Sequence, residues 1–240
     1  MKRIGILCLL GCICFSLSAR TIYVARHGQV GDRKCYDAVV HERTLTPLGR
    51  EQAQLLAQYL TETCHFNGTI IVSPLYQTIE TSRPTAKLLG KQVILDPGIQ
   101  EMNRGPKAVG MTFVQIEERF PGMTVKGPAF TEPWRIANEP DDARTERTAR
   151  ALKRILAENP GDLLLVSHGA IVGDIRKLMN RKLPREKRIS GTVWNCSLWI
   201  YELDDSDQVI SARGTTEFMP DEKVTNNNHP GKLAKEKKDN

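Results

Sequence analysis

An uninterrupted apolar run, Leu163 to Val166, constrains the fold of this 240-residue chain more than any other feature. A strand without a polar residue is typical of the centre of a parallel sheet, where both faces are buried. A helical pattern follows it over residues 170–179, and strand-like and helix-like segments alternate along most of the chain. Because parallel strands need crossover helices, we predict an α/β fold. It is a three-layer sandwich with a mainly parallel sheet and helices on both faces.

The expected strands are rich in aliphatic and β-branched residues and cover residues 21–25, 69–72, 92–95, 163–166, 193–203 and 209–213. The expected helices carry apolar residues at helical spacing and cover residues 47–60, after the N-cap Thr46, and residues 77–89, 112–120, 141–158 and 170–179. Residues 29–43, 105–110 and 126–140 have no clear period and are expected to be irregular.

Composition excludes several protein classes. Hydrophobic residues make up 40% and charged residues 26% of the chain, which excludes collagen, a fully disordered protein and a polytopic membrane protein. The net charge of +6 is a mild excess, so we expect no nucleic-acid partner.

The first twenty residues resemble a targeting segment. Two basic residues precede an apolar stretch of fourteen, shorter than a membrane span of ~20 residues, and small residues precede a cleavage point after Ser18. We expect residues 1–18 to be a signal peptide, the protein to be secreted or periplasmic, and no stable membrane span after cleavage. The segment Leu9–Cys12 also resembles a bacterial lipoprotein box, so lipid anchoring stays open as an alternative.

Cleavage would leave Cys35, Cys64 and Cys196, enough for one disulfide of unassigned pairing and one free thiol. From residue 220 onward the chain is polar and rich in Lys and Asn. We therefore expect a disordered tail over residues 220–240 and a single folded domain over residues 19–219.

Two of the expected strands end in the same way. Arg26, His27 and Gly28 follow the first strand, and His168 and Gly169 follow the strand at 163–166 with one serine between. Ligands in such sheets bind outside the carboxyl ends of the strands, so both histidines should face one cleft. A neutral imidazole can attack phosphorus, an arginine can hold phosphate oxygens, and glycine allows a tight turn beside an anion. The residues thus predict phosphate chemistry.

These segments resemble the histidine phosphatase superfamily, which has the phosphoglycerate mutase-like fold. The matching stretches YVARHG, LTPLGREQA, SPLYQTIET and LLLVSHG run in family order from about Tyr23 to Ser197. The resemblance implies hydrolysis of a small phosphomonoester through a phosphohistidine, without a metal or other cofactor.

The resemblance also implies roles for individual residues. His27 matches the nucleophile, and Arg26 matches the phosphate-binding arginine beside it. His168 matches the second histidine, which stabilises the phosphoryl group in flight. Glu101 matches the acid that protonates the leaving oxygen, and that role needs a partly buried carboxyl with a raised pKa.

Two positions depart from the family pattern. Gln77 stands where the family places a second phosphate-clamping arginine, and losing a charged clamp should cost about 2–4 kcal/mol of transition-state stabilisation. Val30 stands where members often have a hydroxyl residue. We expect a nearby cation to compensate for Gln77; the candidates are Arg33, Lys34, Arg43 and Arg104.

Three other functions stay open. Without compensation for Gln77, the chain would be a phosphate-ligand-binding relative with weak or lost catalysis. A phosphoglycerate-type mutase is disfavoured because the longer Ser- and Asn-containing signature of the glycolytic mutases is absent after Gly28. An empty, uncharged cleft would instead indicate a non-enzymatic secreted interaction protein. The sequence identifies neither the substrate nor the oligomeric state.

Overall fold

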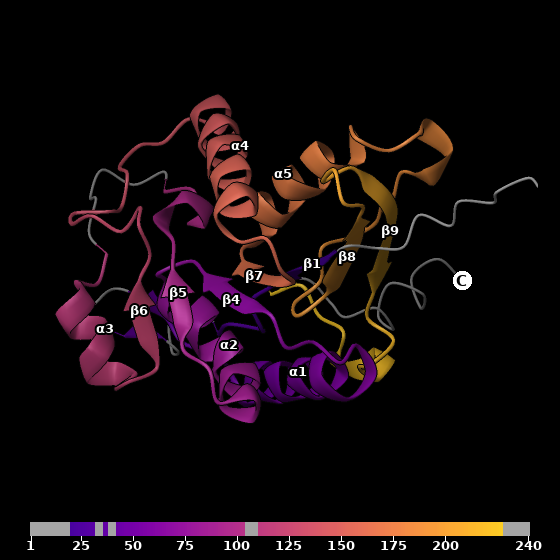
Figure 1. Ribbon diagram of the computed structural model, residues 1–240. Helices are drawn as coiled ribbons and strands as arrows, with labels where there is room; N and C mark the ends of the chain where they lie inside the picture. The colour runs from indigo at the N-terminus through magenta and orange to yellow at the C-terminus, as the bar shows by residue number, and fades with distance from the viewer. Residues whose placement is uncertain (1–19, 32–35, 38–41, 104–109, 228–240) are drawn as a thin grey trace, which may run out of the picture.

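A seven-stranded sheet with the strand order β6-β5-β4-β7-β1-β8-β9 forms the middle layer (Figure 1). The computed structural model describes residues 20–31, 36–37, 42–103 and 110–227. The strands are β1 (Arg20–Arg26), β4 (Thr69–Val72), β5 (Val93–Leu95), β6 (Thr124–Lys126), β7 (Leu163–Ser167), β8 (Leu198–Leu203) and β9 (Val209–Thr215). Strands β6, β5, β4, β7 and β1 pair in parallel, whereas β8 and β9 are antiparallel to their neighbours. A separate small hairpin pairs β2 (Tyr36–Asp37) with β3 (Glu42–Arg43).

Helices cover both faces of this sheet. They are α1 (Pro47–Gln58), α2 (Tyr76–Leu89), α3 (Phe113–Arg119), α4 (Asp141–Glu158) and α5 (Gly169–Asn180). Figure 1 shows α4 and α5 on one side of the sheet and α1 and α2 on the other. The predicted three-layer α/β sandwich is therefore confirmed.

Strand β7 explains why the sheet needs two helical layers. All five of its residues are buried. Leu164 and Val166 pack in the cluster that includes α1 and α2, and Leu163 and Leu165 pack in the cluster that includes α4 and α5. Because consecutive strand residues point to opposite faces, an all-apolar strand is stable only between two apolar layers.

The start of strand β8 was predicted wrongly. The sequence placed it at residue 193, but residues 193–197 form a connecting loop, with Cys196 at a φ of +53°. The three-residue edge strand β6 was not predicted, because three residues are too few for a recognisable period.

The predicted disordered tail is wrong for residues 220–227. A short 3₁₀ turn covers Asp221–Lys223, and Val224 is fully buried in the core that includes α1. The Gln52 side-chain amide donates to Thr225 Oγ1 at 2.9 Å and to the Lys223 carbonyl at 2.6 Å. A polar sequence is ordered over residues 220–227 because its polar groups have partners on α1. The rest of the expected tail, residues 228–240, lies outside the described residues.

Two of the cysteines expected in the mature chain, Cys64 and Cys196, are free thiols, which excludes a disulfide between them. Cys35 lies outside the described residues, as do the expected signal peptide and three of the four candidate cations, Arg33, Lys34 and Arg104. Over the described ranges, each helix is too short or too polar to cross a bilayer.

Candidate active site

Two histidines emerge side by side at the carboxyl edge of the sheet. Strands β1 and β7 are parallel neighbours, with Arg26 aligned to Ser167, so the next residues, His27 and His168, project from adjacent strand ends. Their ring centroids are 5.3 Å apart and their planes meet at 60°. Both rings are buried. The convergence of the two imidazoles expected from the sequence is therefore present.

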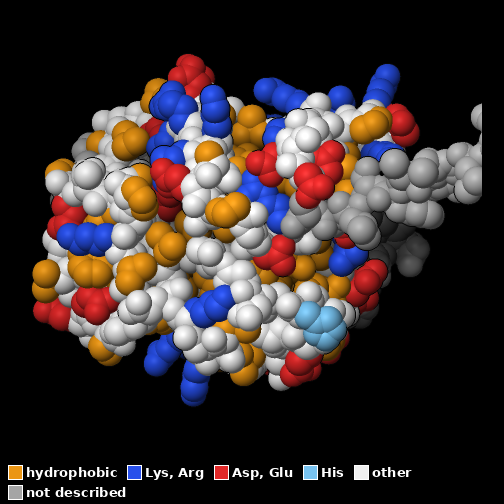
Figure 2. Space-filling view, in the orientation of Figure 1, with side chains coloured by type: hydrophobic (Ala, Val, Ile, Leu, Met, Phe, Trp, Pro, Cys, Tyr) orange, Lys and Arg blue, Asp and Glu red, His pale blue; other side chains and the backbone are white. Residues whose placement is uncertain are grey.

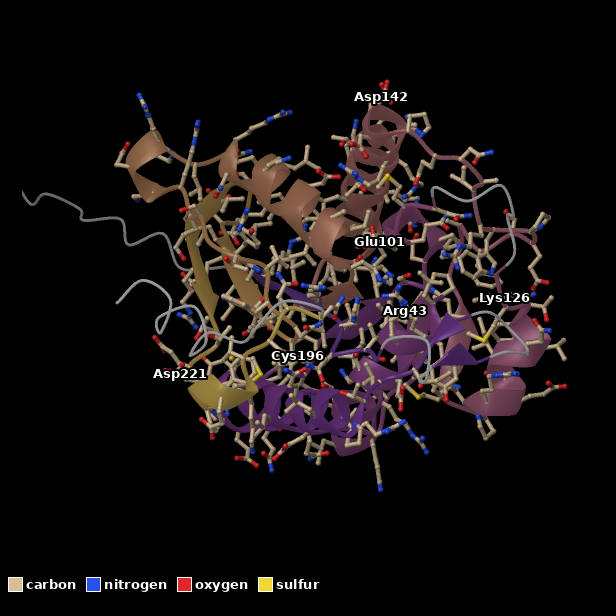
Figure 3. The ribbon with its side chains drawn as sticks, turned by 180° about the vertical axis from the view of Figure 1, so that it is seen from behind. Arg43, Glu101, Lys126, Asp142, Cys196 and Asp221 are labelled. Carbon is tan, nitrogen blue, oxygen red and sulfur yellow. The ribbon has the colours of Figure 1, made fainter. Side chains whose placement is uncertain are left out.

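A cavity of about 350 Å³ lies over the two rings. It collects residues from distant parts of the chain: Arg26, His27, Val30, Arg43, Leu75, Gln77, Glu101, Arg135, His168, Gly169 and Asn227. In Figure 3, Glu101 and Arg43 lie near the middle of the molecule, between the layer that contains α1 and the layer that contains α4. Of the seven site residues expected from the sequence, Gly28 is the one absent from this lining.

The backbone next to His27 determines which nitrogen of its imidazole ring carries the proton. Its Nδ1 lies 2.7 Å from the carbonyl oxygen of Gly28. Since a carbonyl can only accept, Nδ1 carries the proton and Nε2 keeps its lone pair. Burial, with a further contribution from the Arg26 charge, lowers the pKa of His27 from 6.5 to about 3. His27 is thus a neutral imidazole with a lone pair on Nε2.

A residue at the end of strand β4 holds the side chain of His168. Its Nε2 lies 2.8 Å from the hydroxyl of Ser73, the residue after that strand. Burial lowers the pKa of His168 well below its usual value, and the adjacent imidazole of His27 and the positive charge of Arg135 act in the same direction. His168 also precedes α5, whose first residue, Gly169, lines the cavity. The amino end of a helix offers unpaired amides and a partial positive charge, which suit an anion.

Arg26 is fixed beneath the cavity. Its Nη1 donates to the carbonyl of Val193 at 2.8 Å and to Oδ1 of Asn226. A Cβ added at Gly169 would lie 3.5 Å from the Arg26 guanidinium carbon, an ordinary contact, so this guanidinium does not by itself require glycine at position 169. Gly28 acts differently, because a Cβ there would lie 2.5 Å from the carbonyl oxygen of Gly49. Glycine at this position lets the nucleophile loop pack against α1.

Nε of Arg26, Oε1 of Gln77 and Nδ1 of His168 are buried atoms of cavity residues that have no hydrogen-bond partner among the described residues. Buried polar atoms are nearly always paired in folded proteins. Orphaned atoms from three different elements around one cavity therefore indicate a polar ligand.

Glu101 follows the 3₁₀ turn Pro97–Ile99 after strand β5. Burial raises the pKa of its carboxyl, although the Met102 amide, which donates to Oε1 at 2.9 Å, and the Arg26 charge oppose this. The segment is held in place by Glu139, whose amide donates to the Asn103 carbonyl at 3.0 Å. Partial burial and a raised pKa are the properties expected for a proton donor at this position.

A match to a known protein family identifies the class of protein that contains this site. The sequence model described as "Histidine phosphatase superfamily (branch 1)" matches residues 22–216. The chain belongs to the histidine phosphatase superfamily. The predicted family is thereby confirmed, over a range that contains both histidines and Glu101.

Solved structures of this fold are similar along most of the chain. The ecdysone phosphate phosphatase from Bombix mori, in complex with tungstate, has a TM-score of 0.60 and 16% identity over 80% of this chain and 92% of that one. A phosphoserine phosphatase mutant from Entamoeba histolytica, in complex with phosphoserine, has a TM-score of 0.54 and 20% identity over 84% and 100%. A mycobacterial glucosyl-3-phosphoglycerate phosphatase has a TM-score of 0.52 and 21% identity over 88% and 100%. At these identities the likeness is one of fold.

A curated relative is the transcription factor tau 55 kDa subunit of Saccharomyces cerevisiae, 27% identical over 252 residues. The match covers 83% of this chain and 56% of that protein. The chain therefore spans about half the length of this relative.

Sequence reasoning missed two polar residues of this superfamily member's cavity, Arg135 and Asn227. Arg135 lies in the stretch without a clear period, and Asn227 lies in the segment expected to be disordered. Neither residue belongs to a recognisable sequence motif, because only the tertiary fold brings these two segments to the cavity beside the histidines. Of the four candidate cations, Arg43 does line the cavity.

The described residues offer no evident metal centre. No cluster of three or more His, Cys, Asp or Glu side chains suitable for a metal ion occurs among them. A metal-free mechanism stays a prediction of the sequence.

Proposed function

We propose that this protein hydrolyses a phosphomonoester through a phosphohistidine formed on His27. The observation that carries the proposal is the state of His27: a neutral, buried imidazole with its lone pair on Nε2, 5.3 Å from a second histidine in a cavity lined by arginines. A nucleophile needs an available lone pair, and a phosphoryl group needs positive charge around it.

In this reaction Nε2 of His27 attacks phosphorus as the bond from phosphorus to the leaving oxygen breaks. The carboxyl of Glu101 gives its proton to that oxygen, so the alcohol leaves neutral. A water molecule then attacks phosphorus, the bond from phosphorus to Nε2 breaks, and Glu101 takes up a proton of the water. Free phosphate and neutral His27 are regenerated.

The charge on the phosphoryl oxygens is balanced by Arg26 and by the amino end of α5. His168 adds a donor in the tautomer in which the Ser73 hydroxyl donates to Nε2, because Nδ1 then carries a proton beside the cavity. These groups are positioned before the substrate binds, which is the main requirement for electrostatic stabilisation of a transition state.

Two arginines support compensation for Gln77. Arg43 contributes to the low pKa of His27 and Arg135 to that of His168, so one positive charge lies near each imidazole. Both residues line the cavity. We propose that Arg135 with Arg43 supplies the charge that the family usually places at the Gln77 position.

The decisive experiment measures phosphate release from p-nitrophenyl phosphate by wild type and by the His27→Ala variant. We expect release by wild type and its loss in the variant, together with an acid-labile phosphoryl group trapped on His27. His65→Asn is the matched control, since His65 is exposed on the loop before β4. Equal activity of wild type and His27→Ala would refute the proposal.

Two rivals give different results in the same assay. A phosphate-binding relative with lost catalysis, which Gln77 favours, would bind tungstate without releasing phosphate. A mutase would transfer phosphate between positions of phosphoglycerate faster than to water.

The partners and location of the protein remain proposals. We propose a small phosphorylated substrate and no nucleic-acid partner; on the face seen in Figure 2, Lys and Arg side chains are interspersed with Asp and Glu. We also propose export with removal of residues 1–18, which amino-terminal sequencing of the protein isolated from its cells tests.

A further inference from the structure

Residues 220–227, called here the C-terminal strap, lie beyond the segment matched by the family and still reach the candidate active site. The strap is anchored to the rest of the fold. Val224 is fully buried, and Thr225 is buried and accepts a hydrogen bond from the side chain of Gln52 on α1. The amide of Asn195 also donates to the Thr225 carbonyl at 2.8 Å. These contacts fix where the next two residues lie.

The first of these residues, Asn226, contacts the phosphate-binding arginine. Its Oδ1 accepts from Nη1 of Arg26, which also donates to the Val193 carbonyl. Both acceptors are neutral, so they hold the guanidinium without cancelling its charge. The Nε of Arg26 has no partner among the described residues and is left for a ligand.

The second residue, Asn227, lines the cavity itself. Its Oδ1 accepts from Nδ2 of Asn195 at 2.9 Å, and its backbone amide donates to Oδ1 of Asn195 at 2.8 Å. The same Asn195 Nδ2 donates to the carbonyl of His27 at 3.1 Å. One asparagine therefore ties the strap to the backbone of the nucleophile. With Oδ1 engaged, the group that Asn227 offers to a ligand is its Nδ2 donor.

We propose that the C-terminal strap is part of the active site, with Asn226 as a positioning residue for Arg26 and Asn227 as a donor to the oxyanion of the substrate. The proposal rests on the proposed function for the identity of that oxyanion as a phosphoryl group. It gives the strap a role in ligand binding that lies outside the matched segment, residues 22–216.

The test of Asn227 uses the full chain and tungstate, a tetrahedral oxyanion, with binding followed by calorimetry. We expect Asn227→Ala to weaken tungstate binding and to raise KM for p-nitrophenyl phosphate by roughly 10-fold, the effect of one neutral hydrogen bond. Asn227→Asp keeps the acceptor for Asn195 but replaces the donor by a negative charge, so we expect it to weaken binding more than Asn227→Ala does. Asn67→Ala, at an exposed loop, is the control and should change neither value.

The test of Asn226 is a double-mutant cycle with Arg26. We expect Asn226→Ala to weaken tungstate binding by roughly 10-fold in wild type and to have no effect in Arg26→Ala, because it acts through the guanidinium. An equal loss in both backgrounds would mean a merely structural role and would overturn the positioning claim. Asn226→Asp should also weaken binding, since its charge neutralises Arg26 while the contact is kept.

The outcomes separate this proposal from the proposed function. If Asn226→Ala and Asn227→Ala stay within twofold of wild type while His27→Ala abolishes turnover, the strap proposal is overturned and the hydrolase proposal stands. If the strap variants lose tungstate binding but wild type releases no phosphate, the strap proposal stands and hydrolysis is refuted. If wild type neither binds tungstate nor releases phosphate, both are overturned.

Discussion

The low pKa of His27 should make the folded protein sensitive to acid. In the unfolded chain this imidazole has its ordinary pKa of 6.5, whereas in the folded protein burial lowers the value to about 3. The unfolded state therefore binds more protons between these two values, and the free energy of unfolding falls as the pH falls through that window. Above pH 6.5 both states are neutral at His27 and the effect is absent.

The magnitude follows from the size of this gap. One pH unit corresponds to about 1.4 kcal/mol, so His27 alone should lower the free energy of unfolding by about 2 kcal/mol at pH 5 relative to pH 7. Over the whole window the loss approaches about 5 kcal/mol. His168, with a pKa lowered for the same reason, adds to the loss in the same direction.

The assay is urea unfolding of wild type and of the His27→Asn variant at pH 7 and pH 5. Asparagine keeps a side-chain donor for the Gly28 carbonyl and removes the titrating ring. We expect wild type to lose about 2 kcal/mol more than the variant between the two pH values. His65→Asn, which removes an exposed histidine, should behave as wild type. Equal losses in wild type and His27→Asn would show that His27 is not held neutral by burial, and the argument for a nucleophile would fail with it.

Three further predictions concern the arginines and the nucleophile loop. Arg135→Met should lower kcat/KM by about 30- to 1,000-fold, because a charged clamp contributes about 2–4 kcal/mol, and Gln77→Arg should restore much of the loss in that variant; a gain of orders of magnitude from Gln77→Arg alone would contradict compensation. Arg147→Met should lower the free energy of unfolding by about 3–5 kcal/mol, because it leaves the Glu139 carboxylate buried without the guanidinium that now donates to it at 2.6 and 2.7 Å. A loss under about 1 kcal/mol in urea unfolding would show that this ion pair behaves like an exposed one. Gly28→Ala should cost about 1–3 kcal/mol because its Cβ meets the Gly49 carbonyl at 2.5 Å, whereas Gly161→Ala, with nothing within 4 Å, should unfold like wild type.

The sequence by itself determined the layer architecture and the place of the chemistry. The apolar strand β7 required a helical layer on each face, and the N-cap Thr46, whose side chain accepts from the Gly49 amide, began α1 where expected. These features are local, because side-chain periodicity and capping act within a few residues. The position of His27 and His168 after parallel strands then followed from the rule that such strand ends meet at one edge.

Local rules failed where order depends on a distant partner. Residues 220–227 carry polar residues and no period, yet they are held by Gln52, Asn195 and Arg26, which lie far away in the sequence. The start of strand β8 shifted for the same reason, since residues 193–197 bond to the strap and to the nucleophile loop instead of pairing in the sheet.

Only the tertiary structure decided how the site is charged and protonated. Arg135 and Asn227 reach the cavity from segments without a recognisable motif, and Arg43 was one of four candidates that the sequence could not separate. The neutrality of His27 comes from the removal of water by residues packed around it and from the Arg26 charge beside it. The pKa of a buried histidine depends on all the atoms and charges that the fold places around it. The sequence neighbours of a histidine therefore do not determine its pKa by themselves.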